Sequence, residues 1–168
     1  IINDLGSQGI DTSGILQIES ENKTATYVST HDSNGSLIVA CADMKLIETM
    51  SIDHITKEIT RSNASFILFD GNINNATMKK IIKKATINND NDKSIKLIFE
   101  PTSLPKSARL SNAIEKGIVY PNNSISLTLP TIEELRSMYD SFSNNEMFDL
   151  EWANVIFWLS LDGSIFKN

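Results

Sequence analysis

Short apolar runs alternate with longer amphipathic segments in the second half of the chain. Residues 66–69 and 95–99 are apolar runs, and residues 124–129 form a third candidate strand. Apolar runs of this length, separated by segments with helical spacing, are typical of the buried strands of a parallel sheet. The pattern therefore predicts an α/β fold in which a mostly parallel sheet carries helices on both faces.

The segments between and around these strands carry the spacing of amphipathic helices. In residues 75–86, four apolar side chains fall on one helical face with lysines opposite, namely Met78, Ile81, Ile82 and Ala85. Further helices are expected over residues 44–60 with a break near Ser51, and over residues 107–116, 131–141 and 147–161.

A β-hairpin is predicted ahead of the sheet, at about residues 24–42. Two β-rich arms flank Asn34-Gly35, a dipeptide that accepts the positive φ angles of a tight turn. The arms contain Ala25, Tyr27, Ile38 and Ala40 but are not heavily apolar. Such a hairpin suits a flap better than a hydrophobic core.

The composition narrows the class of protein. The 168 residues are 40% apolar and 21% charged, which suits one globular core. No apolar run approaches the roughly 18 to 20 residues of a spanning helix, so no membrane contact is expected. The net charge of −6 and the lack of a dense basic cluster argue against nucleic-acid binding. A single cysteine without zinc-type spacing favours the reducing cytoplasm.

Polar residues follow each predicted strand at its carboxyl end. Asp70 and Asn72 follow the first strand, Glu100 the second, and Thr131 and Glu134 the third. In open α/β sheets, ligands bind beyond the carboxyl ends of the strands, because right-handed crossovers place the strand-to-helix loops at that edge. Each acidic residue could instead be a helix cap, and both interpretations stay open.

Other catalytic patterns are missing from the sequence. The two histidines, His31 and His54, are expected to be plain surface residues, and no nucleophile arrangement is evident. There is no Walker-type phosphate loop and no dinucleotide fingerprint.

Several segments together resemble one family. Residues 9–15 (Gly-Ile-Asp-Thr-Ser-Gly-Ile), the hairpin and Ala42-Asp43-Met44 are similar to the lid region of ribokinase-like (PfkB) sugar and nucleoside kinases. The motifs Asp70-Gly71-Asn72-Ile73, Glu100-Pro101-Thr102-Ser103-Leu104-Pro105-Lys106 and Leu129-Pro130-Thr131-Ile132-Glu133-Glu134-Leu135 then occur in that family's order and spacing. The Asp-Gly-Asn and Glu-Pro-Thr-Ser forms are most similar to pseudouridine kinases, including fungal and animal proteins that fuse the kinase to a pseudouridine-5′-phosphate glycosidase.

This resemblance implies ATP-dependent phosphorylation of a ribosyl 5′-hydroxyl group with Mg²⁺ as cofactor. It implies one ribokinase-like, Rossmann-like domain, with a hairpin lid over about residues 24–42 and a core over about residues 44–168. The residues expected near the substrate are Ala25, Tyr27, Ala40 and Ala42 of the lid, with Asp70 and Asn72. Glu100 and Thr131 are expected near the nucleotide phosphates, and Glu134 near the metal.

The chain also departs from the family pattern. Thr131 stands where the family usually has asparagine, and a threonine is shorter and lacks the amide donor. The glycine-rich sugar-binding region would lie before Ile1, and the Gly-Ala-Gly-Asp motif, which supplies the anion hole and the base, beyond Asn168. We therefore expect a central fragment, truncated at both ends, of a phosphotransferase. Without a base or oxyanion donors, the 168-residue chain is expected to be inactive by itself.

Three alternatives differ in class. A non-catalytic ribokinase-like module would act through its hairpin edge, as a homodimer. A flavodoxin-like or receiver-like domain also places Asp70 at a strand end, but leaves the hairpin unexplained. A metal-dependent hydrolase built on Asp70 and Glu100 would need a histidine, and the strand-end loops contain none.

Overall fold

The computed structural model describes residues 1–18, 24–87, 95–114 and 125–145. They fall into two compact units, Ile1–Asn63 and Ala64–Asn168, and each unit is described by itself. The helix expected over residues 147–161 lies outside the described residues. Among the helices that are described, none combines the length and the apolar character that crossing a bilayer requires.

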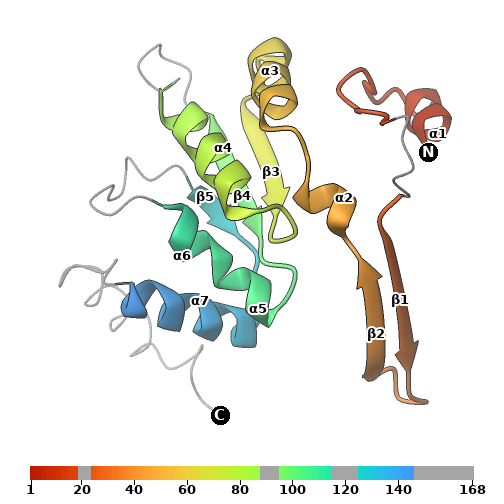
Figure 1. The fold of residues 1–168 in the computed structure, drawn as a ribbon, viewed down its shortest axis with the longest axis vertical. Coiled ribbons are helices and arrows are strands. Elements are labelled where there is room, and N and C mark those ends of the chain that lie inside the picture. Colours follow the sequence, from red (N-terminus) through yellow and green to blue (C-terminus); the bar gives the residue numbers. More distant parts are fainter. Residues whose placement is uncertain (19–23, 88–94, 115–124, 146–168) are drawn as a thin grey trace. The chain divides into compact units, whose positions relative to one another are not determined.

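A parallel three-stranded sheet forms the centre of the second unit (Figure 1). Its strands are β3 (Phe66–Asp70), β4 (Lys96–Glu100) and β5 (Ile125–Thr128), in the order β3-β4-β5. The three predicted strands are thus confirmed, and so is the α/β class. Leu97 and Phe99 of the central strand are fully buried, as the apolar pattern of a parallel strand requires.

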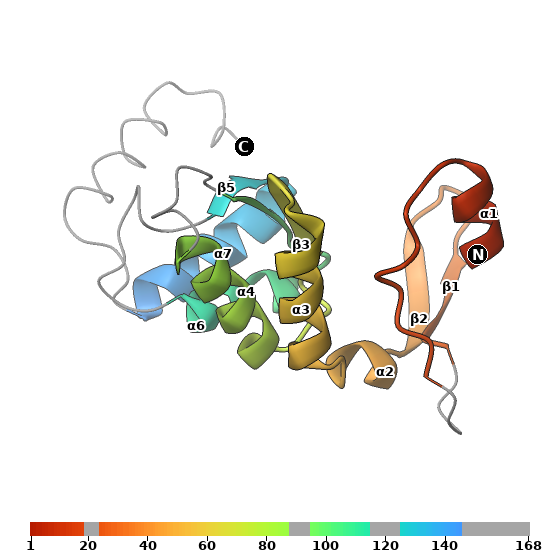
Figure 2. The same ribbon diagram turned by 90° about the horizontal axis from the view of Figure 1, so that it is seen from above.

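One face of this sheet is covered by helices. The helix α4 (Asn75–Ile87) contacts β4 and α6 (Arg109–Ala113), and α4 and α6 lie side by side (Figure 2). All four residues of the predicted apolar face of α4 are buried: Met78, Ile81, Ile82 and Ala85. Between the sheet strands, the Phe69 and Phe99 rings pack in a tilted arrangement with their centroids 5.5 Å apart.

The opposite face of the sheet presents apolar side chains to solvent. Phe66, Leu68 and Leu127 are 59%, 68% and 48% exposed. The cause is topological, because strands added in one direction by right-handed crossovers place their connecting helices on the same face. Helices on both faces were predicted, and within the described part of this unit α4 and α6 cover one face.

The segment after β4 differs in detail from its prediction. One helix was expected over residues 107–116, whereas the structure has two short helices, α5 (Leu104–Ser107) and α6. The first begins earlier because Pro105 stands at its amino-terminal turn, where a missing N–H costs nothing. The unit ends, among the described residues, with α7 (Ile132–Asn144), which packs against α5 and α6.

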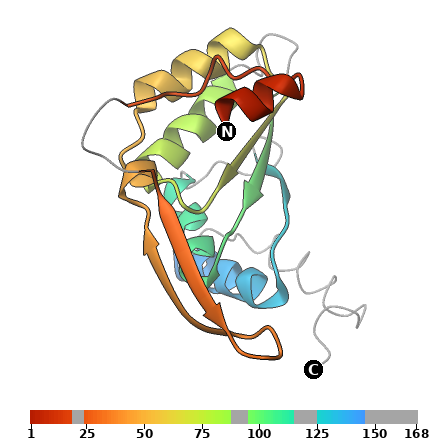
Figure 3. The same cartoon turned by 90° about the vertical axis from the view of Figure 1, so that its right-hand side faces the viewer.

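The first unit contains the predicted hairpin. Strands β1 (Thr26–His31) and β2 (Leu37–Asp43) pair antiparallel (Figure 3), and the turn residue Gly35 has a φ of +83°. Short α2 (Lys45–Glu48) and longer α3 (Ile52–Ser62) follow, separated at the predicted break, where the Ser51 hydroxyl caps α3. The amino-terminal helix α1 (Ile2–Ser7) was not predicted.

Candidate functional site at the carboxyl edge of the sheet

The carboxyl ends of β3 and β4 bring two acidic residues together. Asp70 and Glu100 are register partners on adjacent parallel strands, and both are half-buried. Since β5 runs parallel to β4, the loop that follows it opens at the same edge. The predicted convergence of strand-end residues is therefore present in the backbone of this unit.

The loop after β3 is a polar network centred on Asn72. The Asn72 backbone N–H donates to Asp70 Oδ1 (3.0 Å), and its side-chain Nδ2 donates to Asp70 Oδ2 (2.6 Å). On the other side, Lys106 Nζ of α5 donates to Asn72 Oδ1. The amide of Asn72 thus stands between a carboxylate and an ammonium group, and these two partners determine which way the amide is turned.

Gly71 joins this loop to the loop after β4. Its N–H donates to the Glu100 carbonyl oxygen (2.9 Å) and to Thr102 Oγ1 (3.2 Å). A Cβ atom added at Gly71 would lie 2.5 Å from the Pro101 carbonyl oxygen and 2.9 Å from Lys106 Cβ. The two loops therefore approach so closely that only glycine fits between them.

Arg109 ties α6 to the same loop. Its Nη1 donates to the carbonyl oxygens of Gly71 (3.2 Å) and Asn72 (3.5 Å). Sequence reasoning missed Gly71, Lys106 and Arg109 as contributors to the site. Lys106 lies within the 100–106 motif, but no local pattern shows that its side chain returns to a loop 34 residues away.

Thr131 and Glu134 form a complete capping box at the start of α7. Thr131 Oγ1 accepts from Glu134 N–H (3.2 Å), and Glu134 Oε2 accepts from Thr131 N–H (2.8 Å). The capping interpretation that the sequence left open is thus realised for this pair. Glu134 is only 8% exposed, and one of its carboxylate oxygens is already engaged.

The predicted lid residues lie in the first unit. Tyr27 pairs with Ala42, and Ser29 with Ala40, so Tyr27, Ala40 and Ala42 share one face of the hairpin. Ala25 stands just before β1 and is half-buried. The closure of this hairpin over the sheet edge stays a prediction.

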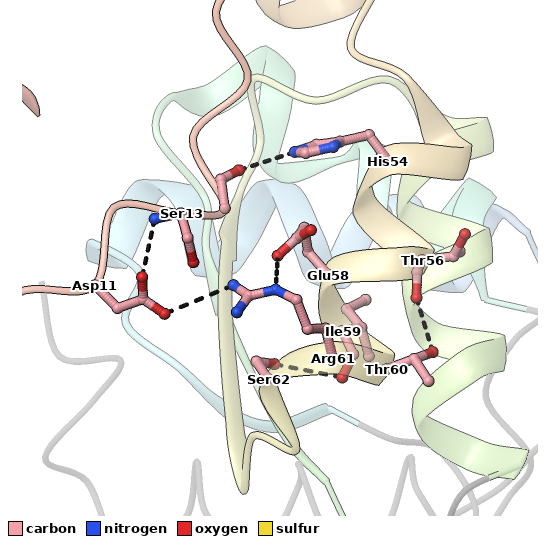
Figure 4. Close-up of polar contacts among 10 residues, drawn as sticks. Asp11, Ser13, His54, Thr56, Glu58, Ile59, Thr60, Arg61 and Ser62 are labelled. Atoms are coloured by element: carbon pink, nitrogen blue, oxygen red, sulfur yellow. Dashed lines mark hydrogen bonds and ion pairs between the residues drawn. The ribbon is translucent and has the colours of Figure 1, made fainter.

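The first unit also holds a polar cluster between residues 11–14 and α3 (Figure 4). His54 Nε2 lies 2.8 Å from the Gly14 carbonyl oxygen, which makes His54 a half-buried contact rather than the expected plain surface residue. Arg61 contacts Asp11 at 3.6 Å and Glu58 at 2.6 Å. Hydrogen bonds from the side chain and the backbone N–H of Ser13 lower the pKa of Asp11, and the charge of Arg61 acts in the same direction.

Within the residues that the structure describes, no group of three or more His, Cys, Asp or Glu side chains is arranged to hold a metal ion. An ion at the sheet edge would therefore depend on ligands beyond these side chains, which is usual for Mg²⁺ because it keeps several waters and binds substrate phosphates.

Comparison with known proteins shows which proteins the chain is similar to. No protein-family model matches it. Over 163 residues it is 26% identical to the pseudouridine-metabolizing bifunctional protein of Schizosaccharomyces pombe. The chain is a distant homologue of that protein. The match covers 90% of this chain but 20% of the yeast protein.

A solved structure supports the same fold. The carbohydrate kinase from Agrobacterium tumefaciens superposes with a TM-score of 0.53 at 18% identity, over 75% of this chain and 40% of the kinase. The chain therefore has the fold of part of a carbohydrate kinase, and the predicted α/β fold with a parallel sheet and a hairpin is confirmed. It spans a fifth of the length of the yeast relative and less than half of this kinase.

Proposed function

We propose that these 168 residues are the central part of one ribokinase-like domain in a protein that phosphorylates pseudouridine with ATP. The observation that carries the proposal is the linked pair of loops at the carboxyl edge of β3 and β4, built on Asp70, Asn72 and Glu100. The distant homology to a pseudouridine-metabolizing protein supports the choice of substrate. That relative is bifunctional, which supports a fused glycosidase domain as the partner of this kinase.

Asp70 and Asn72 are proposed to bind the sugar. Asp70 is an acceptor for ribose hydroxyl groups, and the two Asn72 N–H donors hold it in one orientation. The hairpin would close over the sugar with the face that carries Tyr27, Ala40 and Ala42. Closure of such a lid excludes water while the phosphoryl group is transferred.

Glu100, Thr131 and Glu134 are proposed to serve the nucleotide and its metal. Bound Mg²⁺ would neutralise charge on the transferring phosphoryl group. Oxygen donors suit Mg²⁺, so the residues fit the ion. Because the Glu134 carboxylate is buried and caps α7 through Oε2, it fits contact with Mg²⁺ through water better than direct ligation. The same capping box holds Thr131 in place at the start of α7, where the loop after β5 ends.

Proton removal from the 5′-hydroxyl is assigned to a group outside these residues. Asp70 uses both carboxylate oxygens toward Asn72, and Glu134 is a cap, so neither is placed as a free base. The 168 residues contain no Gly-Ala-Gly-Asp motif, which supplies the base in the family that the chain resembles, so the isolated chain should show no phosphotransfer.

The test is a phosphotransfer assay on the full-length protein. Pseudouridine, uridine, adenosine and ribose are offered separately with ATP and Mg²⁺, and the products are resolved by mass spectrometry. The proposal predicts pseudouridine 5′-phosphate as the main product, and its loss in Asp70→Ala. Equal use of all four acceptors would reduce the assignment to a general sugar or nucleoside kinase, and no product from any acceptor would overturn it.

A second candidate function rests on the hairpin. Val28 of β1 and Ile38 of β2 are 67% and 65% exposed on an extended antiparallel ribbon. Exposed apolar strands invite pairing with another chain, so a non-catalytic module could self-associate through this hairpin. Light scattering decides between the alternatives: a monomer that phosphorylates pseudouridine excludes the second, and an inactive dimer that Val28→Lys dissociates supports it.

A further inference from the structure

Lys106 carries a charge that its surroundings do not balance. Its side chain is half-buried, and its described contact is the neutral amide oxygen of Asn72. The ion pairs found among the described residues all lie in the first unit, so no carboxylate of this part of the chain lies within 4.0 Å of the ammonium group. An ammonium group removed from water without a counter-charge is costly, and a bound anion offsets that cost.

The two nearby acids are turned toward other partners. Asp70 is separated from Lys106 by the Asn72 amide, which accepts from the lysine and donates to the carboxylate. Glu100 Oε1 faces the N–H of Thr102 in its own loop (3.4 Å). The ammonium has three N–H donors and gives one to Asn72, so two are available to a ligand as far as the described residues extend.

Arg109 adds a second positive charge beside this loop. It donates to the carbonyl oxygens of Gly71 and Asn72. These hydrogen bonds hold the backbone of the loop whose Asn72 side chain contacts Lys106. Two cations on α5 and α6 thus face one loop at the edge where ligands of α/β sheets bind. Phosphate oxygens are among the anionic acceptors that form strong, charge-assisted hydrogen bonds with such donors.

We propose that Lys106 binds a phosphate oxygen of the ligand at this edge. This inference rests on the proposed kinase function. It assigns Lys106 to the binding of the phosphate-bearing ligand of that kinase. The phosphate belongs either to the nucleotide or to the phosphorylated product, which present the same oxygen chemistry.

The test measures ligand affinity in the full-length protein. Titrations with ATP, inorganic phosphate, pseudouridine 5′-phosphate and uncharged pseudouridine are compared for the wild type, Lys106→Gln and Lys106→Arg. Glutamine keeps an N–H donor for Asn72 but removes the positive charge. A purely structural role of Lys106 would therefore be preserved in Lys106→Gln. Lys80→Gln, on the exposed side of α4, is the matched control.

Lys106→Gln should weaken binding of the phosphate-bearing ligand about tenfold or more, whereas the arginine variant stays near the wild type. Affinity for pseudouridine should not change, and Lys80→Gln should bind as the wild type does. A loss confined to ATP identifies the nucleotide as the source of the phosphate, and a loss confined to pseudouridine 5′-phosphate identifies the product. Unchanged affinity for every phosphate ligand, or an equal loss for pseudouridine, overturns the inference.

A second measurement needs no variant. Acetylation of Lys106 in the wild-type protein should slow when ATP or pseudouridine 5′-phosphate is added, while acetylation of Lys80 does not, and unprotected Lys106 contradicts the inference. If the protein phosphorylates pseudouridine but Lys106 proves irrelevant to phosphate binding, this inference alone fails. If Lys106 controls phosphate binding but no acceptor is phosphorylated, the proposed function alone fails.

Discussion

At the scale of single residues, the sheet edge is organised by an amide rather than by an ion pair. Asn72 accepts from Lys106 and donates to Asp70, so opposite charges are held apart at a defined spacing. A direct lysine–aspartate contact would neutralise both groups. The arrangement in the structure instead leaves an acceptor on one side and a cation on the other, which suits a ligand that carries both hydroxyl and phosphate groups.

Gly71 occupies a position where the two loops leave no room for a side chain. Replacement by alanine should lower the free energy of unfolding by about 1 to 3 kcal/mol, because a Cβ atom would overlap the Pro101 backbone and force the loops apart. Gly6→Ala is the control, since nothing lies within 4 Å of the added Cβ atom and alanine favours a helix. Urea denaturation measures both variants, and equal stability of the two would contradict the close approach at Gly71.

Asp11 provides a test by pH titration. Ser13→Ala should raise the pKa of Asp11 toward its ordinary value, because the Ser13 side chain is the largest cause of the lowered pKa. A carboxyl group whose pKa is lowered by folding stabilises the folded state above its unfolded pKa of about 3.9, and that contribution is lost as the pH falls through the lower, folded pKa. NMR titration of the Asp11 carboxyl gives the measurement. Ser62→Ala, which removes a hydroxyl bonded to Ile59, should leave it unchanged.

At the scale of elements, boundaries were predictable where side chains set them. The start of α7 was expected at Thr131, and the observed capping box explains why Thr131 and Glu134 stop the helix from extending backward. The break before α3 was likewise expected near Ser51, which caps that helix. The division of α5 from α6 has no such local signal, since it follows from packing against α4 and α7.

Substitutions at Thr131 test its role as a helix cap separately from its proposed contact with the nucleotide. Thr131→Ala should lower stability by about 1 kcal/mol, because the Glu134 N–H loses its acceptor, whereas Thr131→Asn should stay within a few tenths. Thermal unfolding followed by circular dichroism measures the difference. A Thr131→Asn variant as unstable as Thr131→Ala would show that the cap is not what stabilises the start of α7.

At the scale of the whole molecule, the apolar pattern predicted the strands and the buried face of α4. It did not predict the contacts that build the site, because Lys106 and Asn72, and Arg109 and Gly71, lie 34 and 38 residues apart along the chain. His54 was misjudged for the same reason, since its partner lies 40 residues away along the chain. Contacts between residues so far apart along the chain depend on topology, and the periodicity of apolar residues does not predict them.

The central claim is that one ligand site lies at the carboxyl edge of the three-stranded sheet. Hydrogen exchange of the full-length protein, with and without pseudouridine plus ATP, tests it directly. Backbone amides in residues 70–73, 100–107 and 129–135 should gain protection together when both ligands are present. Unchanged exchange in all three segments, with protection gained elsewhere, would contradict it.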